Sequence, residues 1–418
     1  MKFIHTADIH LDSPLTGLAA YKDAPADMLR TVTRDAFTRL VDVAIEESVD
    51  FMVIAGDLYD GTWKDYNTGH FFCREMGRLN KVGIPVYLLF GNHDADSEMT
   101  KKLTLPPNVY QFETRKANTF RNEILKVALH GRSYKEAATV ENLAASYPKP
   151  VEGWLNIGVL HTALEGYSAH ANYAPCSLAE LNAKGYDYWA LGHVHEYAIL
   201  QEDPWVVFPG NLQGRHIRET GARGAVMVTV DDTSIHSVER LPVDSLRWYL
   251  VEVDAAEAVT LDDVVRLVGR KFEQLVAATP ENIYLSVRVL IKGKTTAHGE
   301  LFGLESHLRE EILGQAAGQG IDRMWVEKVR IETEPVTDAV DIAARSDAIA
   351  DLQKFLDDAP NDAALLASLM EDLRPLGDKA PFELIQSVPD LNAIRNGNLA
   401  DIVKSVTPGL LAYLAKSN

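Results

Sequence analysis

Short apolar runs alternate with stretches of helical periodicity in the first part of the chain. The runs over residues 50–57 and 84–94 are apolar at most positions, as buried strands are, and residues 2–8, KFIHTAD, also read as a strand. Residues 28–48 and 67–82 lie between them and repeat apolar residues at the spacing of one helix face. This order predicts a parallel sheet with covering helices, because parallel neighbours need a crossover connection.

From about residue 124 the apolar runs follow one another more closely. The six runs are EILKVALHG, WLNIGVLHTA, YDYWALGHVHE, WVVFPGN, GAVMVTVDD and SIHSVERL. Their spacing indicates a second and more antiparallel sheet. We therefore expect an α/β fold for residues 1–240, with two sheets packed as a sandwich and helices outside.

The rest of the chain has a different pattern. The segment LPVDSL marks a boundary, and residues 241–335 then alternate strand and helix as a small α+β domain. Its helices are expected over about 261–277 and 304–313, with Gly314 ending the second. Residues 336–418 have no convincing strand pattern, so we expect a helical C-terminal tail.

Apolar residues of this tail gather in three clusters. They are Ile342, Ile349, Leu352 and Leu356; Leu365, Leu366, Leu369, Met370 and Leu373; and Leu399, Ile402, Val403 and Val406, the last ended by Pro408 and Gly409. The first cluster has near-heptad spacing. Two interpretations stay open: the helices pack on one another as a small unit, or they dock on a partner protein.

The composition is that of an acidic globular protein, with a formal net charge of −19. Because phosphate contacts need Lys and Arg, any binding of nucleic acid must rest on a local patch, on bound cations or on a partner. No run approaches the roughly 18 to 20 apolar residues of a membrane helix, and the start lacks a signal-peptide pattern. Cys73 and Cys176 match no disulfide framework, so we expect a cytoplasmic protein.

Five groups of polar residues stand where an apolar run ends. They are Asp8 and His10; Asp57; Asn92, His93 and Asp94; His161; and His193 and His195. In open α/β sheets, ligands bind in the crevice outside the carboxyl ends of the strands. Gly56, Gly91 and Gly192 precede three of the groups, and glycine lets the backbone come close to a ligand.

These residue types favour metal binding over a simple acid–base site. His161 alone could be a core histidine and Asp8 alone a helix cap, but five such groups in one chain argue for a shared site. The set offers too many ligands for one ion and about enough for two, which at roughly 3.5–4 Å apart clamp a phosphoryl group in an in-line displacement. Mixed nitrogen and oxygen ligands suit Mn, Fe or Zn better than Mg.

The same residues resemble the motifs of the calcineurin-like metallophosphoesterase superfamily. The motifs read Asp8-Ile9-His10, Gly56-Asp57, Gly91-Asn92-His93-Asp94, His161 and Gly192-His193-Val194-His195. The segments FIHTADIHLDSP and FPGNLQGRHIRETGARG are similar to its DNA-repair nuclease branch, namely bacterial SbcD-like proteins and especially YhaO-type exonucleases. The resemblance implies a two-sheet metallophosphoesterase sandwich, followed by a capping domain and partner-binding helices.

The resemblance also implies a role for each motif residue. One ion, with manganese expected, would be held by Asp8, His10, Asp57 and His195, and the other by Asp57, Asn92, His161 and His193. A hydroxide bridging the two ions would attack phosphorus, His93 would assist the leaving oxygen, and Asp94 would orient the His93 ring. Archaeal and eukaryotic members carry His where this chain has Asp60, so a phosphate contact made by that His does not carry over.

The implied function is a two-metal phosphodiesterase that acts on DNA, as an exonuclease or endonuclease in end processing. Its implied partner is an SMC-like coiled-coil ATPase of the SbcC or YhaN type, docked on the C-terminal helices, and the family suggests a homodimer. Arg215, His216 and Arg218 are candidates for contacting the DNA backbone, against the alternative of surface charges on a loop. Two other functions stay open: a phosphoesterase of a small phosphodiester or a phosphoprotein, and a catalytically silent DNA-end scaffold for an ATPase.

Overall fold

A computed structural model describes residues 1–13, 26–60, 66–96, 103–164, 174–320, 323–336, 348–381, 384–385 and 389–416. The chain divides into two compact units. The first comprises Met1–Tyr249 and Glu281–Ser286, and the second comprises Leu250–Pro280 and Val287–Asn418. The domain boundaries expected at 240 and 335 stay predictions.

The first sheet of the first unit has six strands in the order β12–β11–β1–β2–β3–β4. Their bounds are Ser234–Pro242 for β12, Gly224–Asp231 for β11, Lys2–Thr6 for β1, Phe51–Ala55 for β2, Val86–Leu89 for β3 and Val109–Gln111 for β4. Strands β1, β2 and β3 are parallel, as predicted, and are connected through helices α1 (Ala26–Glu46) and α2 (Tyr66–Lys81). Strand β4, which the sequence did not predict, pairs in parallel with β3.

The second sheet has six strands in the order β5–β6–β7–β8–β10–β9. Their bounds are Asn118–Asn122 for β5, Val127–Gly131 for β6, Leu155–His161 for β7, Tyr188–Gly192 for β8, Trp205–Phe208 for β10 and Ala198–Glu202 for β9. The expectation of a more antiparallel sheet is wrong, because β6, β7, β8 and β10 are parallel neighbours. The sequence predicts β11 and β12 as members of this sheet. In the structure they belong to the first sheet, where β11 pairs in antiparallel fashion with β1 and β12 pairs in the same way with β11.

Three apolar clusters hold these layers together. Phe37 and Phe72 of the helices pack against the outer face of the first sheet. Side chains such as Phe51, Ile157 and Tyr188 fill the space between the two sheets and are fully buried. A third cluster around Trp189 covers the outer face of the second sheet, where the short helix α4 (Leu178–Asn182) lies. The two-sheet sandwich with outer helices is therefore confirmed.

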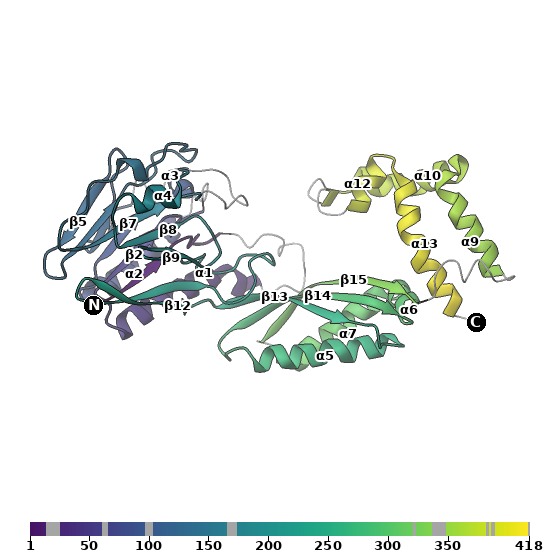
Figure 1. Ribbon diagram of the computed structural model, residues 1–418. Coiled ribbons are helices and arrows are strands. Elements are labelled where there is room, and N and C mark those ends of the chain that lie inside the picture. The colour runs from purple at the N-terminus through teal and green to yellow at the C-terminus, as the bar shows by residue number, and fades with distance from the viewer. Residues whose placement is uncertain are drawn as a thin grey trace. The chain divides into compact units, whose positions relative to one another are not determined.

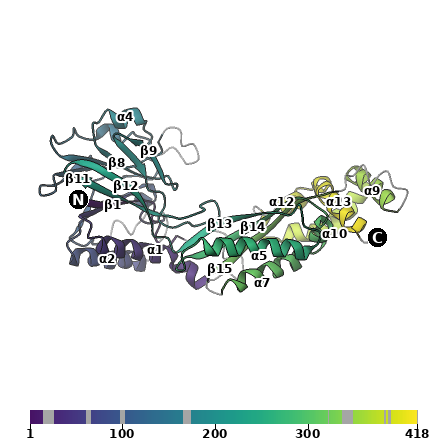
Figure 2. The same cartoon turned by 60° about the horizontal axis from the view of Figure 1, so that its bottom comes forward.

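A three-stranded sheet follows, in the order β13–β14–β15, with α5 and α7 on one of its faces (Figures 1 and 2). The bounds are Leu246–Asp254 for β13, Leu261–Ala277 for α5, Tyr284–Thr295 for β14, His298–Gly303 for α6, Glu305–Gly318 for α7 and Met324–Pro335 for β15. The prediction that Gly314 ends a helix is wrong, because α7 continues to Gly318. The glycine with a left-handed backbone is Gly320, at φ 117°, just past the helix.

The described residues of the C-terminal region are helical, as predicted. The helices are α9 (Ala348–Asp358), α10 (Ala363–Lys379), α12 (Pro389–Arg395) and α13 (Leu399–Lys416), with a 3-10 turn at Ala359–Asn361. Pro408 and Gly409 do not end the last helix, which continues to Lys416. Ile342 and the side chain of Ile349, both in the first predicted cluster, lie outside the described residues. Within the described part of the chain, no helix combines the length and apolarity that a membrane crossing requires.

Close packing between β7 and β8 gives a prediction about stability. A Cβ atom on Gly158 of β7 would overlap the indole ring of the buried Trp189, so we expect Gly158→Ala to destabilise the protein by about 1–3 kcal/mol. Gly77 of α2 has open space around it, and Gly77→Ala should stabilise by about 0.5–1 kcal/mol. Chemical unfolding of both variants checks this, and equal midpoints would contradict the packing described here.

Candidate metal centre

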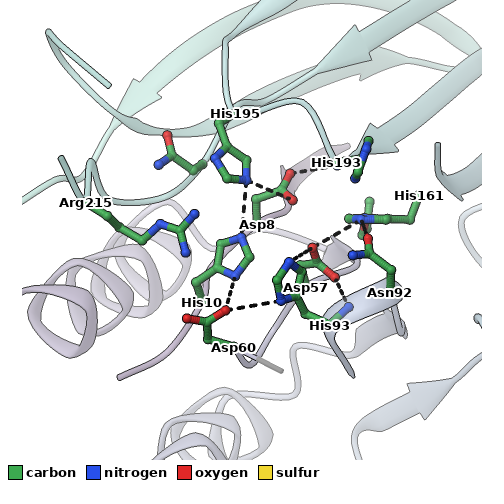
Figure 3. A network of polar contacts seen from close by, with 12 residues as sticks. Asp8, His10, Asp57, Asp60, Asn92, His93, His161, His193, His195 and Arg215 are labelled. Atoms are coloured by element: carbon green, nitrogen blue, oxygen red, sulfur yellow. Dashed lines mark hydrogen bonds and ion pairs between the residues drawn. The ribbon is translucent and has the colours of Figure 1, made fainter. Parts of the chain in front are cut away.

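The five predicted groups of polar residues meet at one edge of the sandwich (Figure 3). Asp8 and His10 follow β1, Asp57 follows β2, and Asn92 begins the short helix α3 (Asn92–Asp96) after β3. From the second sheet, His161 is the last residue of β7, and His193 and His195 follow β8. The carboxyl ends of parallel strands thus bring together residues that are up to 187 positions apart, as the sequence predicted.

Main-chain hydrogen bonds lock the loops to one another. The N–H of Asp8 donates to the carbonyl of Gly56 at 3.0 Å, and the N–H of His10 donates to the carbonyl of Asp57 at 3.0 Å. The N–H of His193 donates to Oδ2 of Asp8 at 2.9 Å, which joins the loops of the two sheets. Three of the expected ligands, Asp8, His10 and His193, are therefore fixed by hydrogen bonds to the loop after a neighbouring strand.

Several of these ligands have an unusual backbone conformation. The φ angles are positive at Asp8 (49°), His10 (46°), Asp57 (52°) and His193 (97°). Such a conformation costs of order 1–3 kcal/mol for a residue other than glycine, and it persists only where the surroundings enforce it. The interlocking loops supply that enforcement, and the strain marks this edge as a functional site.

The three glycines of the motifs are needed for space. A Cβ atom on Gly56 or Gly192 would overlap the ring of His161, and one on Gly91 would overlap the carboxylate of Asp57. Gly56 also has a φ of 101°, which side chains disfavour. The close approach expected from the sequence is thus found at all three positions.

Asp8, His10 and His195 form the first cluster of possible metal ligands. The Nε2 atoms of His10 and His195 lie 3.3 Å apart, and Nε2 of His195 lies 3.9 Å from Oδ1 of Asp8. That Oδ1 atom is buried and has no hydrogen-bond partner among the described residues. A buried carboxylate oxygen without a partner, facing two imidazole nitrogens, fits a divalent cation.

Asp57, His161 and His193 form the second cluster. Nε2 of His161 lies 3.3 Å from Oδ2 of Asp57 and 3.0 Å from Oδ1 of Asn92. The other ring nitrogen, Nδ1, lies 2.9 Å from the carbonyl of Ala55. A proton on Nδ1 would donate to this carbonyl and leave Nε2 free to bind a metal, an arrangement common in metal sites.

The electrostatics of the cluster also suit cations. Burial raises the pKa of Asp8 and lowers the pKa of His10 well below its usual value. Burial alone would lower the pKa of His161, but the Asp57 carboxylate raises it to about 9. The Asp57 carboxylate thus favours positive charge beside His161, and the same attraction would favour a cation bound there.

His93 lies beside both clusters, with 41% of its side chain exposed. Its main-chain N–H donates to Oδ1 of Asp57 at 3.0 Å, and its ring Nδ1 lies 3.2 Å from Oδ1 of Asp60. His10, Asp60 and His93 thereby form a third group whose ligand atoms lie close together. Asp60 therefore contributes a carboxylate that contacts the ring of His93.

The role predicted for Asp94 needs correction. Its Oδ1 accepts the main-chain N–H of Tyr59 at 2.9 Å, and its Oδ2 accepts those of Gly91 at 2.9 Å and Leu58 at 3.2 Å. Asp94 therefore ties the loop after β2 to the loop after β3, and the carboxylate placed to orient the His93 ring is that of Asp60. Asp94 directly follows His93 in the sequence, whereas Asp60 comes close to the His93 ring only in the folded chain, so the sequence favoured the wrong carboxylate.

Glu219 is a site residue that the sequence did not predict. Its Oε1 lies 2.8 Å from Nδ1 of His195, and its Oε2 accepts from the main-chain N–H of Arg215 at 2.7 Å and from Asn211 at 3.0 Å. A carboxylate on the far nitrogen of a ligating histidine fixes the ring and makes it a stronger ligand. The acidic residue inside the otherwise basic segment RHIRETGAR was the available signal.

The three predicted DNA-contact residues have different positions. Arg215 points toward His10 and is 16% exposed, so it belongs to the metal site (Figure 3). His216 is partly exposed, with Nε2 3.6 Å from Glu219. Arg218 is exposed. The structure thus brings only Arg215 to the predicted ligands.

Comparison with known proteins identifies the class to which this fold and site belong. The calcineurin-like phosphoesterase family matches residues 1–197, and the middle domain of the metallophosphoesterase YhaO matches residues 248–334. The YhaO metallophosphoesterase of Bacillus subtilis (strain 168) is 35% identical over 279 residues, covering 66% of this chain and 68% of the relative. The chain therefore belongs to the calcineurin-like metallophosphoesterases, a family of metal-dependent phosphoester hydrolases with a dimetal centre.

More distant similarities were also found. The DNA double-strand break repair protein Mre11 of Sulfurisphaera tokodaii is 24% identical over 285 residues, covering 65% of this chain and 70% of the relative. The solved structure of TT1561 from Thermus thermophilus covers 58% of this chain and 98% of its own, at 12% identity and a TM-score of 0.34. The Mre11 similarity agrees with the expected DNA-repair branch.

The contact between Glu219 and His195 gives a prediction about metal affinity. Glu219→Gln keeps the size of the side chain and removes its charge, so it should weaken one of two manganese sites about 10–100-fold. Calorimetric titration of metal-free protein with Mn²⁺ measures this. Glu196→Gln is the matched control, because that carboxylate is 65% exposed and pairs with Arg223. Unchanged affinity at both sites in Glu219→Gln would contradict the assigned role.

Proposed function

We propose that the protein is a metal-dependent nuclease that hydrolyses phosphodiester bonds of DNA. The observation that carries the proposal is the position of His93, half exposed beside two clusters of possible metal ligands. This arrangement offers a phosphate two cations on one side and a proton donor on the other. The Mre11 relative supports DNA as the substrate.

The chemistry requires one bond to form and one to break. Water forms a new bond to phosphorus and loses a proton, while the bond from phosphorus to the leaving oxygen breaks. Bound divalent ions would supply Lewis acidity and make the water nucleophilic near neutral pH. His93 would donate a proton to the leaving oxygen, and its hydrogen bond to Asp60 raises its pKa, which favours the protonated form.

The substrate must approach a protein that carries a net charge of −19. Bound cations at the metal centre would offset part of that charge where the phosphate binds. The exposed Arg218 is a candidate contact to the DNA backbone beside the site. A partner would supply the extended basic surface that long DNA requires.

The proposed partner is an SMC-like coiled-coil ATPase of the YhaN type, bound by the C-terminal helices. An apolar groove of about 350 Å³ lies among α9, α10 and α13, and Phe355, Leu369 and Val406 are among its lining residues. Phe355 is 54% exposed and Val406 is 40% exposed, although both are apolar. An amphipathic helix of a coiled coil would cover such a groove.

Replacement of His93 tests the proposed catalytic role. His93→Ala should keep both metal ions, because His93 is not among the expected ligands, and should lose about 10²–10⁴-fold in turnover. The measurement is cleavage of an end-labelled DNA duplex with manganese, and with chelator as the blank. His70 of α2 is exposed, so His70→Ala is a matched control. Wild-type cleavage by His93→Ala at full metal occupancy would refute the role.

The groove can be tested by a pair of substitutions in the C-terminal helices. Phe355→Asp places a charge in the groove and should weaken binding of a YhaN-type ATPase at least about 10-fold, because an unpaired charge in an apolar contact is costly. Leu376 is 56% exposed and does not line the groove, so Leu376→Asp is the control. Surface plasmon resonance with the purified ATPase measures both, and equal affinity would contradict the docking site.

A further inference from the structure

Arg215 places its guanidinium at the rim of the metal site. Its Nη1 donates to Oγ of Ser13 at 3.2 Å, and that hydroxyl donates to Oδ2 of Asp60 at 2.7 Å. The other oxygen of Asp60 lies 3.2 Å from Nδ1 of His93. Arg215 is therefore joined through two side chains to the residue proposed as the proton donor, and Figure 3 shows it facing His10.

The guanidinium of Arg215 lacks the full set of acceptors that other partly or fully buried arginines have. Arg34 forms a fork with the carboxylate of Asp12, and Arg247 forms one with Asp244. Arg223 contacts four acceptors. Among the described residues, no carboxylate lies within hydrogen-bond distance of the Arg215 guanidinium, whereas Arg34, Arg223 and Arg247 each have one. The buried Nε of Arg215 has no partner, as is also true of Nε of Arg223.

Glu219 forms an ion pair with this guanidinium at 3.8 Å but makes no hydrogen bond to it. Its carboxylate oxygens are engaged by His195, by Asn211 and by the main-chain N–H of Arg215, and its nearest contact with the guanidinium is 3.8 Å. The carboxylate thus fixes the main chain of Arg215 by a hydrogen bond to its N–H. The guanidinium keeps donors that can bind another anion. A largely buried guanidinium that has no hydrogen-bonded carboxylate is stabilised when an anion binds to it.

We propose that Arg215 binds a non-bridging oxygen of the phosphate that undergoes hydrolysis, on the side of the site formed by His10 and His195. The planar fork of arginine suits two oxygens of one phosphate. Glu219 is then a positioning residue that couples one expected metal ligand to this phosphate contact. The inference rests on the proposed phosphodiesterase activity, and it differs from a contact to the DNA backbone away from the cut.

The test uses the full chain, manganese and a small diester, bis(4-nitrophenyl) phosphate, beside duplex DNA. Arg215→Ala should lower kcat/KM about 100-fold on both substrates, because both contain the phosphate that is hydrolysed. Arg215→Lys should recover about 10-fold of this loss by restoring the charge without the fork. Arg121→Ala, on the edge strand β5, removes an exposed charge and should leave the small diester unaffected.

A binding measurement keeps the inference testable without turnover. Inorganic phosphate should bind manganese-loaded Arg215→Ala at least about 10-fold more weakly than wild type, with metal content and unfolding midpoint unchanged. A loss on DNA alone, with wild-type hydrolysis of the diester and wild-type phosphate affinity, would overturn the inference in favour of a backbone contact. A wild-type protein that hydrolyses the diester but not DNA would refute the proposed DNA substrate and leave the role of Arg215 standing.

Discussion

The buried carboxylate of Asp57 is the constraint on which the rest of the site depends. It stands at the end of β2, between the loops of both sheets, with 2% of its side chain exposed. One oxygen accepts the main-chain N–H of His93 and the other faces His161. An ionised group in this position is tolerated only with compensating positive charge. Divalent cations held by these residues would supply that charge, and they would also supply the Lewis acidity for phosphoester hydrolysis.

The sandwich is what makes this arrangement possible. Parallel strands in each sheet end at a common edge, and the apolar layer between the sheets holds the two edges together. The loops at that edge adopt left-handed backbone at four expected ligands, which an isolated chain would avoid. The packing of the strands stabilises these loops, and so does the carboxylate of Asp94. The rest of the fold therefore offsets the free-energy cost of the strained backbone. The centre is therefore set by the fold before any ion binds.

The sequence predicted those parts that depend on local pattern. Apolar runs predicted most of the strands, and the polar residues that follow them predicted which side chains meet at one edge of the sandwich, because both patterns can be read along a single sequence. The pairing of β11 with β1 was missed, because the two strands are more than 200 residues apart. The pattern of residues within a strand does not indicate which distant strand it pairs with. The role of Asp60 was missed for the same reason. Asp94 follows His93 in the sequence, but in the folded loops it is the carboxylate of Asp60 that contacts the His93 ring. Glu219 was missed because its contact with His195 exists only in three dimensions.

The central claim is that one carboxylate serves two metal ions. Crystals of the protein grown with manganese, measured on both sides of the Mn absorption edge, test it most directly. The account predicts two anomalous peaks about 3.5–4 Å apart, one beside His10 and His195 and the other beside His161 and His193, with Asp57 between them. A single peak, or two peaks that do not share Asp57, would contradict it.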